Sequence, residues 1–356
     1  MNPVGTRPPE SLLIVRLGAM GDVIHTLPAV AALRTAFPQT RIGWIIEQRW
    51  MELLCTKDLP SSGSRGPARP LVDFVHVVDT KRWRKSPFSR QTRRQMSAVR
   101  KELIGEHYEL AVDFQGAVKS AILSRFAKSN LGAEHPRETP ARMMYKIRVS
   151  THGSHVIEQY HSLAEAVAGK ALAPAAAEFP HEDSADAKIS TQLSNWSSEV
   201  VLINPGAGWE AKQWPAEQYG EVARALSADG YTVLVNFGPG EEELASAVQQ
   251  ASNKTVVPIS CFIAELIAFT RRAKLFIGGD TGPLHLAAAM RIPVVAIFGP
   301  TDPVRNGPYG TKSIVLRHPA SRSSLSHTSD PDPGLLRITP DEVILAAQTL
   351  LQDAHA

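Results

Sequence analysis

Apolar, β-rich runs alternate with glycine turns and helical patterns along nearly the whole chain. In the first half, strands are expected at 12–16, 41–47, 72–78 and 109–115. Helices are expected near 22–36, 88–106 and 116–127. The second half restarts the pattern, with strand-and-turn segments at 199–208, 231–240, 274–282 and 293–301. Because strands that alternate with helices form parallel sheets, the sequence predicts two consecutive α/β domains.

The chain length and a change of composition indicate where these domains divide. A chain of 356 residues has room for two domains of about 150 residues. The stretch 171–188 is rich in Ala and Pro and poor in large apolar side chains, which is typical of a linker. We expect an N-terminal domain over 1–175, a linker region over 176–198, a C-terminal domain over 199–338 and a closing helix over 339–356.

Charge is divided unevenly between the two halves. Residues 1–180 hold 25 Lys and Arg against 16 Asp and Glu, and the remainder hold 13 against 19. The two halves are therefore expected to meet different partners. Much of the basic excess lies in 81–95, where Lys and Arg surround Trp83 and Phe88. Two interpretations stay open for this segment: a solvated helix with its entry loop, or a patch that binds anions or faces a membrane.

Several classes of protein and site are disfavoured. Cys55 and Cys261 are far apart and outside any CxxC pattern, so neither a disulfide framework nor a thiolate metal site is expected, and a reducing cytoplasm fits. The Asp330–Asp332 pair lies in a polar, Pro-rich stretch, 318–336, which is expected to be a surface loop without metal. The sequence has neither a signal-peptide pattern nor an apolar run approaching about 18 residues, so we expect a soluble or membrane-surface protein without a nucleic-acid partner.

The turn RLGAMGD, residues 16–22, places an acid where an anion site is expected. Glycine turns before helices often hold phosphates, because the helix N-terminus has free N–H groups and a partial positive charge. The turn lacks the spacing of a dinucleotide or P-loop motif, and Asp22 stands where the helix should start. Asp22 is interpreted either as an N-cap or as a general base at the edge of a cleft.

Glycine-rich strand ends recur in the second half and suit a phosphorylated ligand. In FIGGDTG, the small residues and Thr281 precede a helix start that can hold a pyrophosphate, while Asp280 either caps that helix or accepts hydrogen bonds from sugar hydroxyls. Lys212 can offset charge on a departing phosphate. Glu241 either binds ribose hydroxyls or caps its helix, and His285 either serves the ligand or faces the core.

Three stretches together resemble a known family. Residues 12–34 (LLIVRLGAMGDVIHTLPAVAALR), 113–121 (DFQGAVKSA) and 280–310 (DTGPLHLAAAMRIPVVAIFGPTDPVRNGPYG) resemble the ADP-heptose:lipopolysaccharide heptosyltransferases of glycosyltransferase family 9. The type I enzymes are the most similar, because 81–85 (KRWRK) and 136–146 (PRETPARMMYK) also have counterparts there. The resemblance extends over residues 11–312.

The resemblance implies a GT-B fold, with two Rossmann-like doubly wound domains that face each other across a cleft. The acceptor, a Kdo residue of the lipid A inner core, would bind the N-terminal domain, which agrees with its basic charge. The donor, ADP-L-glycero-β-D-manno-heptose, would bind the C-terminal domain, and transfer would invert the anomeric centre. The family implies no required cofactor or metal, and a peripheral position on the cytoplasmic face of the inner membrane.

The resemblance also implies roles for particular residues. Asp22 matches the general base, Lys212 a phosphate-binding lysine, and Asp280 the carboxylate that contacts heptose hydroxyls. The remaining donor-binding candidates are Glu241, Thr281, Gly282 and His285. The candidates for Kdo carboxylates and lipid phosphates are Arg82, Arg84, Lys85, Arg137, Arg142 and Lys146.

The sequence departs from the family pattern at two turns and leaves other functions open. Gly18-Ala19 and the GAG at 206–208 stand where hydroxyl residues are expected. One alternative is a heptosyltransferase II or another family 9 enzyme with a different acceptor or nucleotide-sugar. A second is a GT-B nucleotide-sugar epimerase or binding protein without a lipid partner. The missing fingerprint disfavours a Rossmann dehydrogenase.

Overall fold

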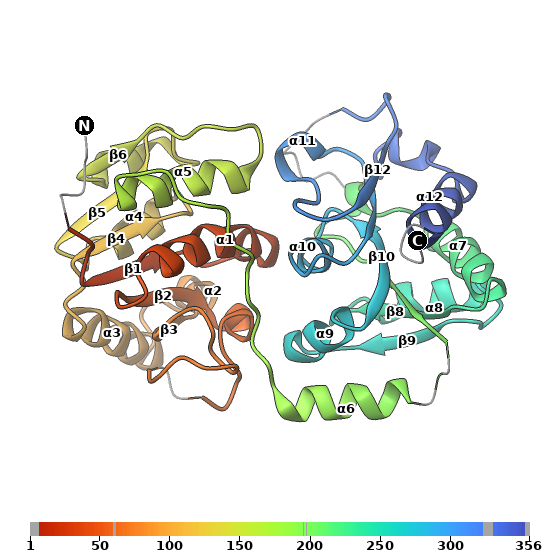
Figure 1. Cartoon of the computed structure of the whole chain (residues 1–356), viewed down its shortest axis with the longest axis horizontal. Coiled ribbons are helices and arrows are strands. Elements are labelled where there is room, and N and C mark those ends of the chain that lie inside the picture. The colour runs from red at the N-terminus through yellow and green to blue at the C-terminus, as the bar shows by residue number, and fades with distance from the viewer. Residues whose placement is uncertain (1–6, 60–61, 195, 197, 323–329, 353–356) are drawn as a thin grey trace. The chain divides into compact units, whose positions relative to one another are not determined.

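A computed structural model describes residues 7–59, 62–194, 196, 198–322 and 330–352. The chain forms two compact units that divide between Glu182 and Asp183. Both units have parallel sheets surrounded by helices (Figure 1). The α/β class and the parallel sheets predicted from the alternating pattern are confirmed. The finer limits, with a linker over 176–198, stay a proposal.

The first unit is built on a sheet of the order β3-β2-β1-β4-β5-β6, parallel at every pairing. Its strands are β1 (Ser11–Val15), β2 (Arg41–Glu47), β3 (Phe74–Val78), β4 (Leu110–Asp113), β5 (Ser129–Ala133) and β6 (Ile147–Val149). Its helices are α1 (Met20–Ala36), α2 (Thr80–Lys85), α3 (Arg90–Gly105), α4 (Val118–Ser124) and α5 (Val156–Ala168), with 3-10 turns η1 (Gln48–Leu53) and η2 (Thr139–Met144).

The second unit repeats this plan with a sheet of the order β12-β11-β10-β7-β8-β9, again parallel. Its strands are β7 (Val200–Asn204), β8 (Thr232–Phe237), β9 (Val257–Ser260), β10 (Ala273–Gly279), β11 (Val294–Phe298) and β12 (Ser313–Arg317). Its helices are α6 (Asp183–Leu193), α7 (Ala216–Ala228), α8 (Glu242–Ala251), α9 (Ile263–Thr270), α10 (Gly282–Ala289), α11 (Pro303–Asn306) and α12 (Pro340–Gln352), with 3-10 turns η3 (Glu210–Lys212) and η4 (Leu335–Arg337).

The burial of the inner strands accounts for the apolar runs from which these strands were predicted. Strands β1, β7 and β11 are buried along their whole length, as expected for strands with helices on both faces of a parallel sheet. Strands β5, β6, β9 and β12, which lie at or next to a sheet edge, were not predicted. Strands β5, β6 and β9 are short or interrupted by Asn, Gly or Pro, so pairing with a neighbour fixes them rather than an apolar run. Helices α2 and α6 were also missed.

The order of strands reverses at one place in each sheet. In the first unit β1 lies between β2 and β4, and in the second unit β7 lies between β8 and β10. Connections leave the two central strands toward opposite faces at these points, which opens a crevice beyond the carboxyl ends of the strands. We therefore expect functional side chains in the segments that follow β1, β4, β7 and β10.

Part of the predicted surface loop at 318–336 is buried. Residues 323–329 lie outside the described part of the chain, but Ser321 and Asp332 are less than a tenth exposed. The Asp332 carboxylate accepts hydrogen bonds from the Ser321 hydroxyl (2.5 Å) and from the N–H groups of Gly334 (3.0 Å) and Leu335 (2.9 Å). Asp332 therefore holds this turn together, and the expectation of an entirely surface loop was wrong.

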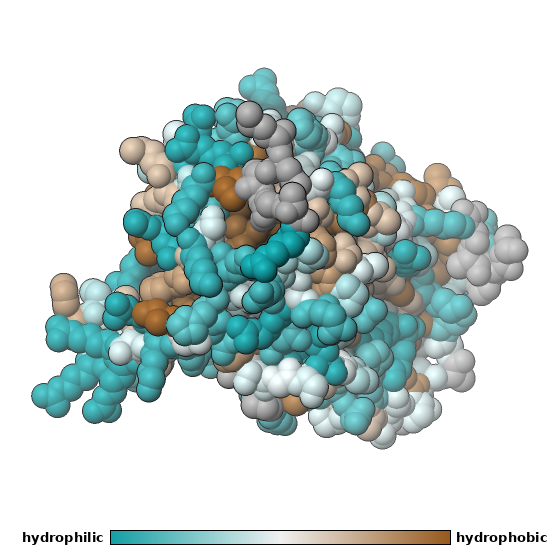
Figure 2. Space-filling model, turned by 60° about the vertical axis from the view of Figure 1, so that its left-hand side comes forward, coloured by the Kyte–Doolittle hydropathy of each residue, from teal (hydrophilic) through white to brown (hydrophobic). Residues whose placement is uncertain are grey.

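The surface shown in Figure 2 is mostly hydrophilic, with hydrophobic residues in small groups. None of the helices in the described part of the chain has the length and apolar character needed to cross a membrane.

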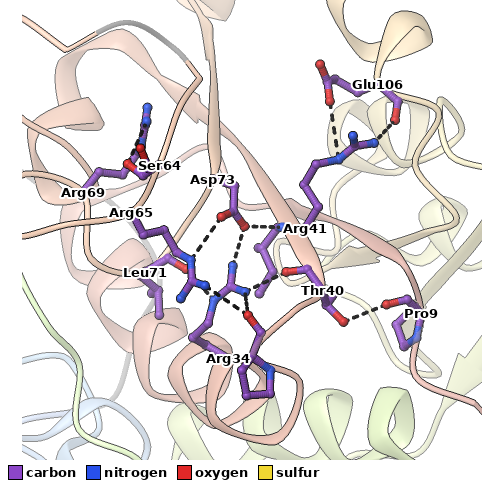
Figure 3. Close-up of polar contacts among 12 residues, drawn as sticks. Pro9, Arg34, Thr40, Arg41, Ser64, Arg65, Arg69, Leu71, Asp73 and Glu106 are labelled. Atoms are coloured by element: carbon purple, nitrogen blue, oxygen red, sulfur yellow. Dashed lines mark hydrogen bonds and ion pairs between the residues drawn. The ribbon is translucent and has the colours of Figure 1, made fainter.

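The buried side chain of Arg34 connects the end of α1 to the loop before β3 through hydrogen bonds and an ion pair (Figure 3). Arg34 donates to the carbonyls of Leu71 (3.1 Å) and Thr40 (2.7 Å), and its Nη2 pairs with the Asp73 carboxylate (2.6 Å). Burial lowers the pKa of Arg34, and the charge of Asp73 opposes that shift. Asp73 also accepts from the Ile42 N–H (2.8 Å), so the cluster connects α1, β2 and the chain entering β3.

Arg34→Gln is expected to destabilise the first unit by about 3 kcal/mol, because it removes the buried cation that pairs with Asp73 and leaves several carbonyls without their donor. Urea unfolding followed by tryptophan fluorescence measures this. The matched control is Arg41→Gln: Arg41 is half exposed where it pairs with Glu106, so its loss should cost less than about 1 kcal/mol. Equal losses for the two variants would contradict a specific role for Arg34.

Candidate active site

The turn after β10 forms the centre of the candidate site in the second unit. Strand β10 is apolar and buried, and it ends in Gly278 and Gly279. A Cβ at Gly278 would lie 2.9 Å from the Asn204 carbonyl oxygen, so the glycine permits close approach of β10 to β7. Thr281 occupies the N-cap position of α10, and Gly282 begins the helix. The N-terminus of α10 thus lies beyond the carboxyl end of a central strand, where the sequence predicted an anion site.

The Asp280 carboxylate is held between Lys212 and His285. Its Oδ2 lies 2.5 Å from Lys212 Nζ, and its Oδ1 lies 3.0 Å from His285 Nε2. The three side chains are each at most a tenth exposed. Burial by itself raises the pKa of Asp280, but the hydrogen bonds and charges of His285 and Lys212 outweigh it and hold that pKa well below its ordinary value. The carboxylate therefore remains ionised at neutral pH.

Pairing of β7 with β10 brings these side chains together. Lys212 lies in η3, between β7 and α7, whereas Asp280 and His285 flank the start of α10. The Lys212 ammonium also lies 4.1 Å from the centre of the Trp209 ring, which favours a cation at that place. We call Lys212, Asp280 and His285 the ion cluster.

The ion cluster corrects one interpretation of the sequence. Asp280 is not a helix cap, because among the described residues its carboxylate bonds to Lys212 and His285 rather than to N–H groups of α10. His285 is buried and contacts Asp280, and its role toward a ligand stays a prediction. The sequence placed Lys212 and Asp280 at the same edge of one sheet, but it did not indicate that they form an ion pair.

Glu241 lies against the turn that follows β7. Its Oε2 accepts from the Gly238 N–H (2.8 Å), and a Cβ at Gly206 would lie 2.2 Å from its Oε1. Glu241 occupies the N-cap position of α8, but its side chain makes no capping bond to that helix. A side chain at position 206 would require the Glu241 carboxylate to move, so Gly206 has a steric reason.

Two buried asparagines were missed by the sequence analysis. The Asn236 amide donates to Asn204 Oδ1 (2.7 Å), and the Asn204 amide donates to the Gly206 carbonyl (3.3 Å). Asn204 ends β7 and Asn236 lies near the end of β8, so together they connect the ends of these two strands and hold the turn that carries Gly206. The signal in the sequence was a polar residue at the end of each of two apolar runs.

In the first unit, Asp22 is the third residue of α1 and not its N-cap. The helix begins at Met20, two residues earlier than predicted. The Asp22 carboxylate accepts from the Ala19 N–H (3.2 Å) and pairs with Arg16 Nη2 (2.7 Å). Its side chain is 37% exposed. The N-cap interpretation was therefore wrong in position, although the carboxylate does bond to the backbone at the start of the helix.

The predicted acceptor residues fall into two groups that the sheet order separates. Arg82, Arg84 and Lys85 are exposed on α2, which follows the edge strand β3. The other group lies near β5 and β6, at the opposite edge of the same sheet. In that group, Arg142 pairs with Glu134 (3.3 Å) and Lys146 donates to the Lys128 carbonyl (2.6 Å). Arg137 is exposed.

No group of three or more His, Cys, Asp or Glu side chains suited to a metal ion occurs within residues 7–59, 62–194, 196, 198–322 and 330–352.

A family model described as glycosyltransferase family 9 (heptosyltransferase) matches residues 96–332. The chain belongs to glycosyltransferase family 9. The chain is 29% identical over 315 residues to lipopolysaccharide heptosyltransferase 1 of Escherichia coli K12, a match that covers 86% of this chain and 93% of that protein. It is 27% identical over 314 residues to the Pseudomonas aeruginosa protein of the same name, with 86% and 83% covered.

Solved structures agree with this assignment. The structure described as E. coli heptosyltransferase WaaC with ADP has a TM-score of 0.77 and 26% identity, covering 97% of this chain and 99% of that one. The family 9 chain is thus a glycosyltransferase, and the two Rossmann-like doubly wound units of the expected GT-B fold are confirmed.

Asp280→Asn is expected to destabilise the second unit by about 3 kcal/mol, because it leaves Lys212 and His285 buried without their counter-charge. The folded-state pKa of Asp280 is depressed, so its contribution is complete above the unfolded-state value of about 3.9. It is lost as the pH falls through the lower folded-state pKa. Urea unfolding should show a constant advantage of the wild type at higher pH that shrinks below about pH 4. An advantage that is absent at pH 6 would contradict this assignment.

Proposed function

We propose that this family 9 glycosyltransferase moves L-glycero-D-manno-heptose from ADP-heptose to a Kdo residue of the lipid A inner core, with inversion at the anomeric carbon. The observation that carries the proposal is the ion cluster beside the N-terminus of α10, at the reversal of strand order in the second unit. Relatives named lipopolysaccharide heptosyltransferase 1 support the heptose donor and the core acceptor. A structure described as WaaC with ADP-2-deoxy-2-fluoro heptose, 26% identical, supports the same donor.

In this proposal the donor binds the turns after β7, β8 and β10. The N–H groups at Thr281 and Gly282 receive the pyrophosphate, since a helix N-terminus favours an anion. Asp280 accepts hydrogen bonds from the heptose hydroxyls, and Glu241 contacts the nucleoside. Lys212 is already beside Asp280, so its charge is in place when the diphosphate leaves. His285 fixes the second oxygen of Asp280.

The reaction is a single displacement. The Kdo hydroxyl attacks the anomeric carbon from the face opposite ADP, the bond from that carbon to the phosphate oxygen breaks, and Asp22 takes the hydroxyl proton. ADP leaves with its charge stabilised by Lys212 and the α10 N-terminus, so we propose that no divalent metal or other cofactor is essential. The mechanism requires the hydroxyl held near Asp22 to reach the anomeric carbon of the donor.

We further propose that the basic α2 and the start of α3 bind the anionic acceptor at a membrane surface. Arg82, Arg84 and Lys85 are exposed on α2, and Phe88 in the following turn is 80% exposed. A cluster of cations beside an exposed aromatic ring suits an anionic lipid surface. Arg137 is the strongest acceptor candidate of the second group, since the side chains of Arg142 and Lys146 are engaged within the chain. The enzyme would act at the cytoplasmic face of the inner membrane as a peripheral protein.

Purified enzyme with ADP-heptose is expected to add one heptose to Kdo-lipid A, detected by mass spectrometry. Asp22→Asn should lower turnover by at least about 100-fold, the usual contribution of a general base, while ADP-heptose binding by calorimetry is retained. Asp341→Asn is the matched control, because Asp341 is another exposed acid in the first turn of a helix. Transfer only to an already heptosylated acceptor would instead indicate a type II enzyme, and near-normal turnover of Asp22→Asn would remove its role as base.

Charge reversal on α2 tests the acceptor surface. The triple variant Arg82→Glu, Arg84→Glu, Lys85→Glu is expected to raise the KM for Kdo-lipid A by at least about tenfold, because several phosphate-facing cations become anions. The KM for ADP-heptose should stay unchanged. The control reverses Lys170 and Lys254, which are exposed elsewhere. An unchanged acceptor KM in the triple variant would rule out this surface and favour an enzyme without a lipid partner.

A further inference from the structure

Arg16 places a buried cation beside Asp22. Its side chain is only 4% exposed, and arginine side chains are almost never fully buried unless they are paired. Nη1 donates to the Phe114 carbonyl (2.7 Å) just after β4, and Nη2 pairs with Asp22 Oδ2 (2.7 Å). The guanidinium also lies 5.3 Å from the centre of the Tyr160 ring on α5. One side chain therefore connects β1, the end of β4, α5 and the candidate base.

The two oxygens of Asp22 are not equivalent. Oδ2 accepts from both Arg16 Nη2 (2.7 Å) and the Ala19 N–H (3.2 Å). Oδ1 has no hydrogen-bond partner among the residues that the structure describes. A carboxylate held by one oxygen keeps a fixed orientation, and its second oxygen stays available to a ligand.

The backbone that carries Arg16 is itself fixed. The Trp44 indole donates to the Arg16 carbonyl (2.9 Å), and the Leu17 N–H donates to Gln115 Oε1 (2.9 Å). Gln115 is set in turn by Asp113, whose Oδ1 accepts from the Gln115 N–H (2.8 Å). Arg16 directly follows the last residue of β1, and these hydrogen bonds hold its backbone in place, which is what a precise orientation of Asp22 needs.

We propose that Arg16 is a positioning residue that holds Asp22 through Oδ2 and reserves Oδ1 to receive the proton of the attacking hydroxyl. This inference rests on the proposed function. The hydroxyl oxygen forms its bond to the anomeric carbon, the bond from that carbon to ADP breaks, and the proton moves to Oδ1. Arg16 touches neither substrate and acts only through Asp22, in contrast to Lys212, which lies with the donor site.

The test compares Arg16→Gln with Arg34→Gln, a buried arginine of the same unit that pairs with Asp73 away from Asp22. Arg16→Gln should lower kcat by about 100-fold, the usual effect of a misplaced reacting group, with the KM for ADP-heptose unchanged. Arg16→Lys keeps the charge and should recover part of kcat. Arg34→Gln should lower stability and leave kcat unchanged.

A double variant separates positioning from a merely structural role. If Arg16 acts through Asp22, then Arg16→Gln combined with Asp22→Asn should be no slower than Asp22→Asn alone. Losses that multiply, or an Arg16→Gln enzyme with normal kcat, would overturn the inference. Where Arg16→Gln does not fold, Arg16→Lys carries the same cycle, with an intermediate loss that disappears in the Asp22→Asn background.

Failure of the proposed function has a different signature. If the wild-type enzyme transfers no heptose, or if Asp22→Asn has normal turnover, then Asp22 is not shown to be the base. The inference about Arg16 then loses its basis. A strongly impaired Asp22→Asn beside an unimpaired Arg16→Gln would keep the proposed function and overturn the role of Arg16 alone.

Discussion

Parallel pairing of the central strands, β1 with β4 and β7 with β10, decides where the charged groups of this enzyme can meet. All strands of a parallel sheet end at the same edge, and the reversal of order leaves that edge open between the central pair. Lys212 and Asp280 are 68 residues apart in sequence, and Arg16 and Phe114 are 98 apart. Each pair meets because its two strands are neighbours.

The ion cluster and the Arg16–Asp22 pair both keep ionised groups in largely buried positions, which is costly unless the charges are paired and hydrogen-bonded. Asp280 satisfies this condition with Lys212 and His285, and its depressed pKa is the result. Arg16 is partnered by a carbonyl, a carboxylate and an aromatic ring, although its buried Nε has no hydrogen-bond partner among the described residues. Such arrangements are oriented before any substrate arrives, so the proposed transfer would not have to reorganise them as charge develops.

The sequence predicted the central strands because their apolar runs are long and uninterrupted, and it predicted Asp22, Lys212 and Asp280 because polar residues followed those runs. It did not predict the outer strands β5, β6, β9 and β12, of which β5, Ser129–Ala133, depends on its neighbours rather than on its own side chains. It also could not show that Arg16 turns back to Asp22. Such contacts depend on side-chain directions and on strand order, neither of which a local pattern contains. Asn204 and Asn236 were overlooked for the same reason.

The central claim is a single displacement in which Asp22 removes the acceptor proton while ADP leaves from the opposite face. The most direct measurement is the anomeric configuration of the transferred heptose, determined by NMR of the product formed from ADP-L-glycero-β-D-manno-heptose and Kdo-lipid A. An α-linked heptose is expected, because one displacement inverts the β-configured donor. A β-linked product would contradict it, since retention requires a different course of reaction.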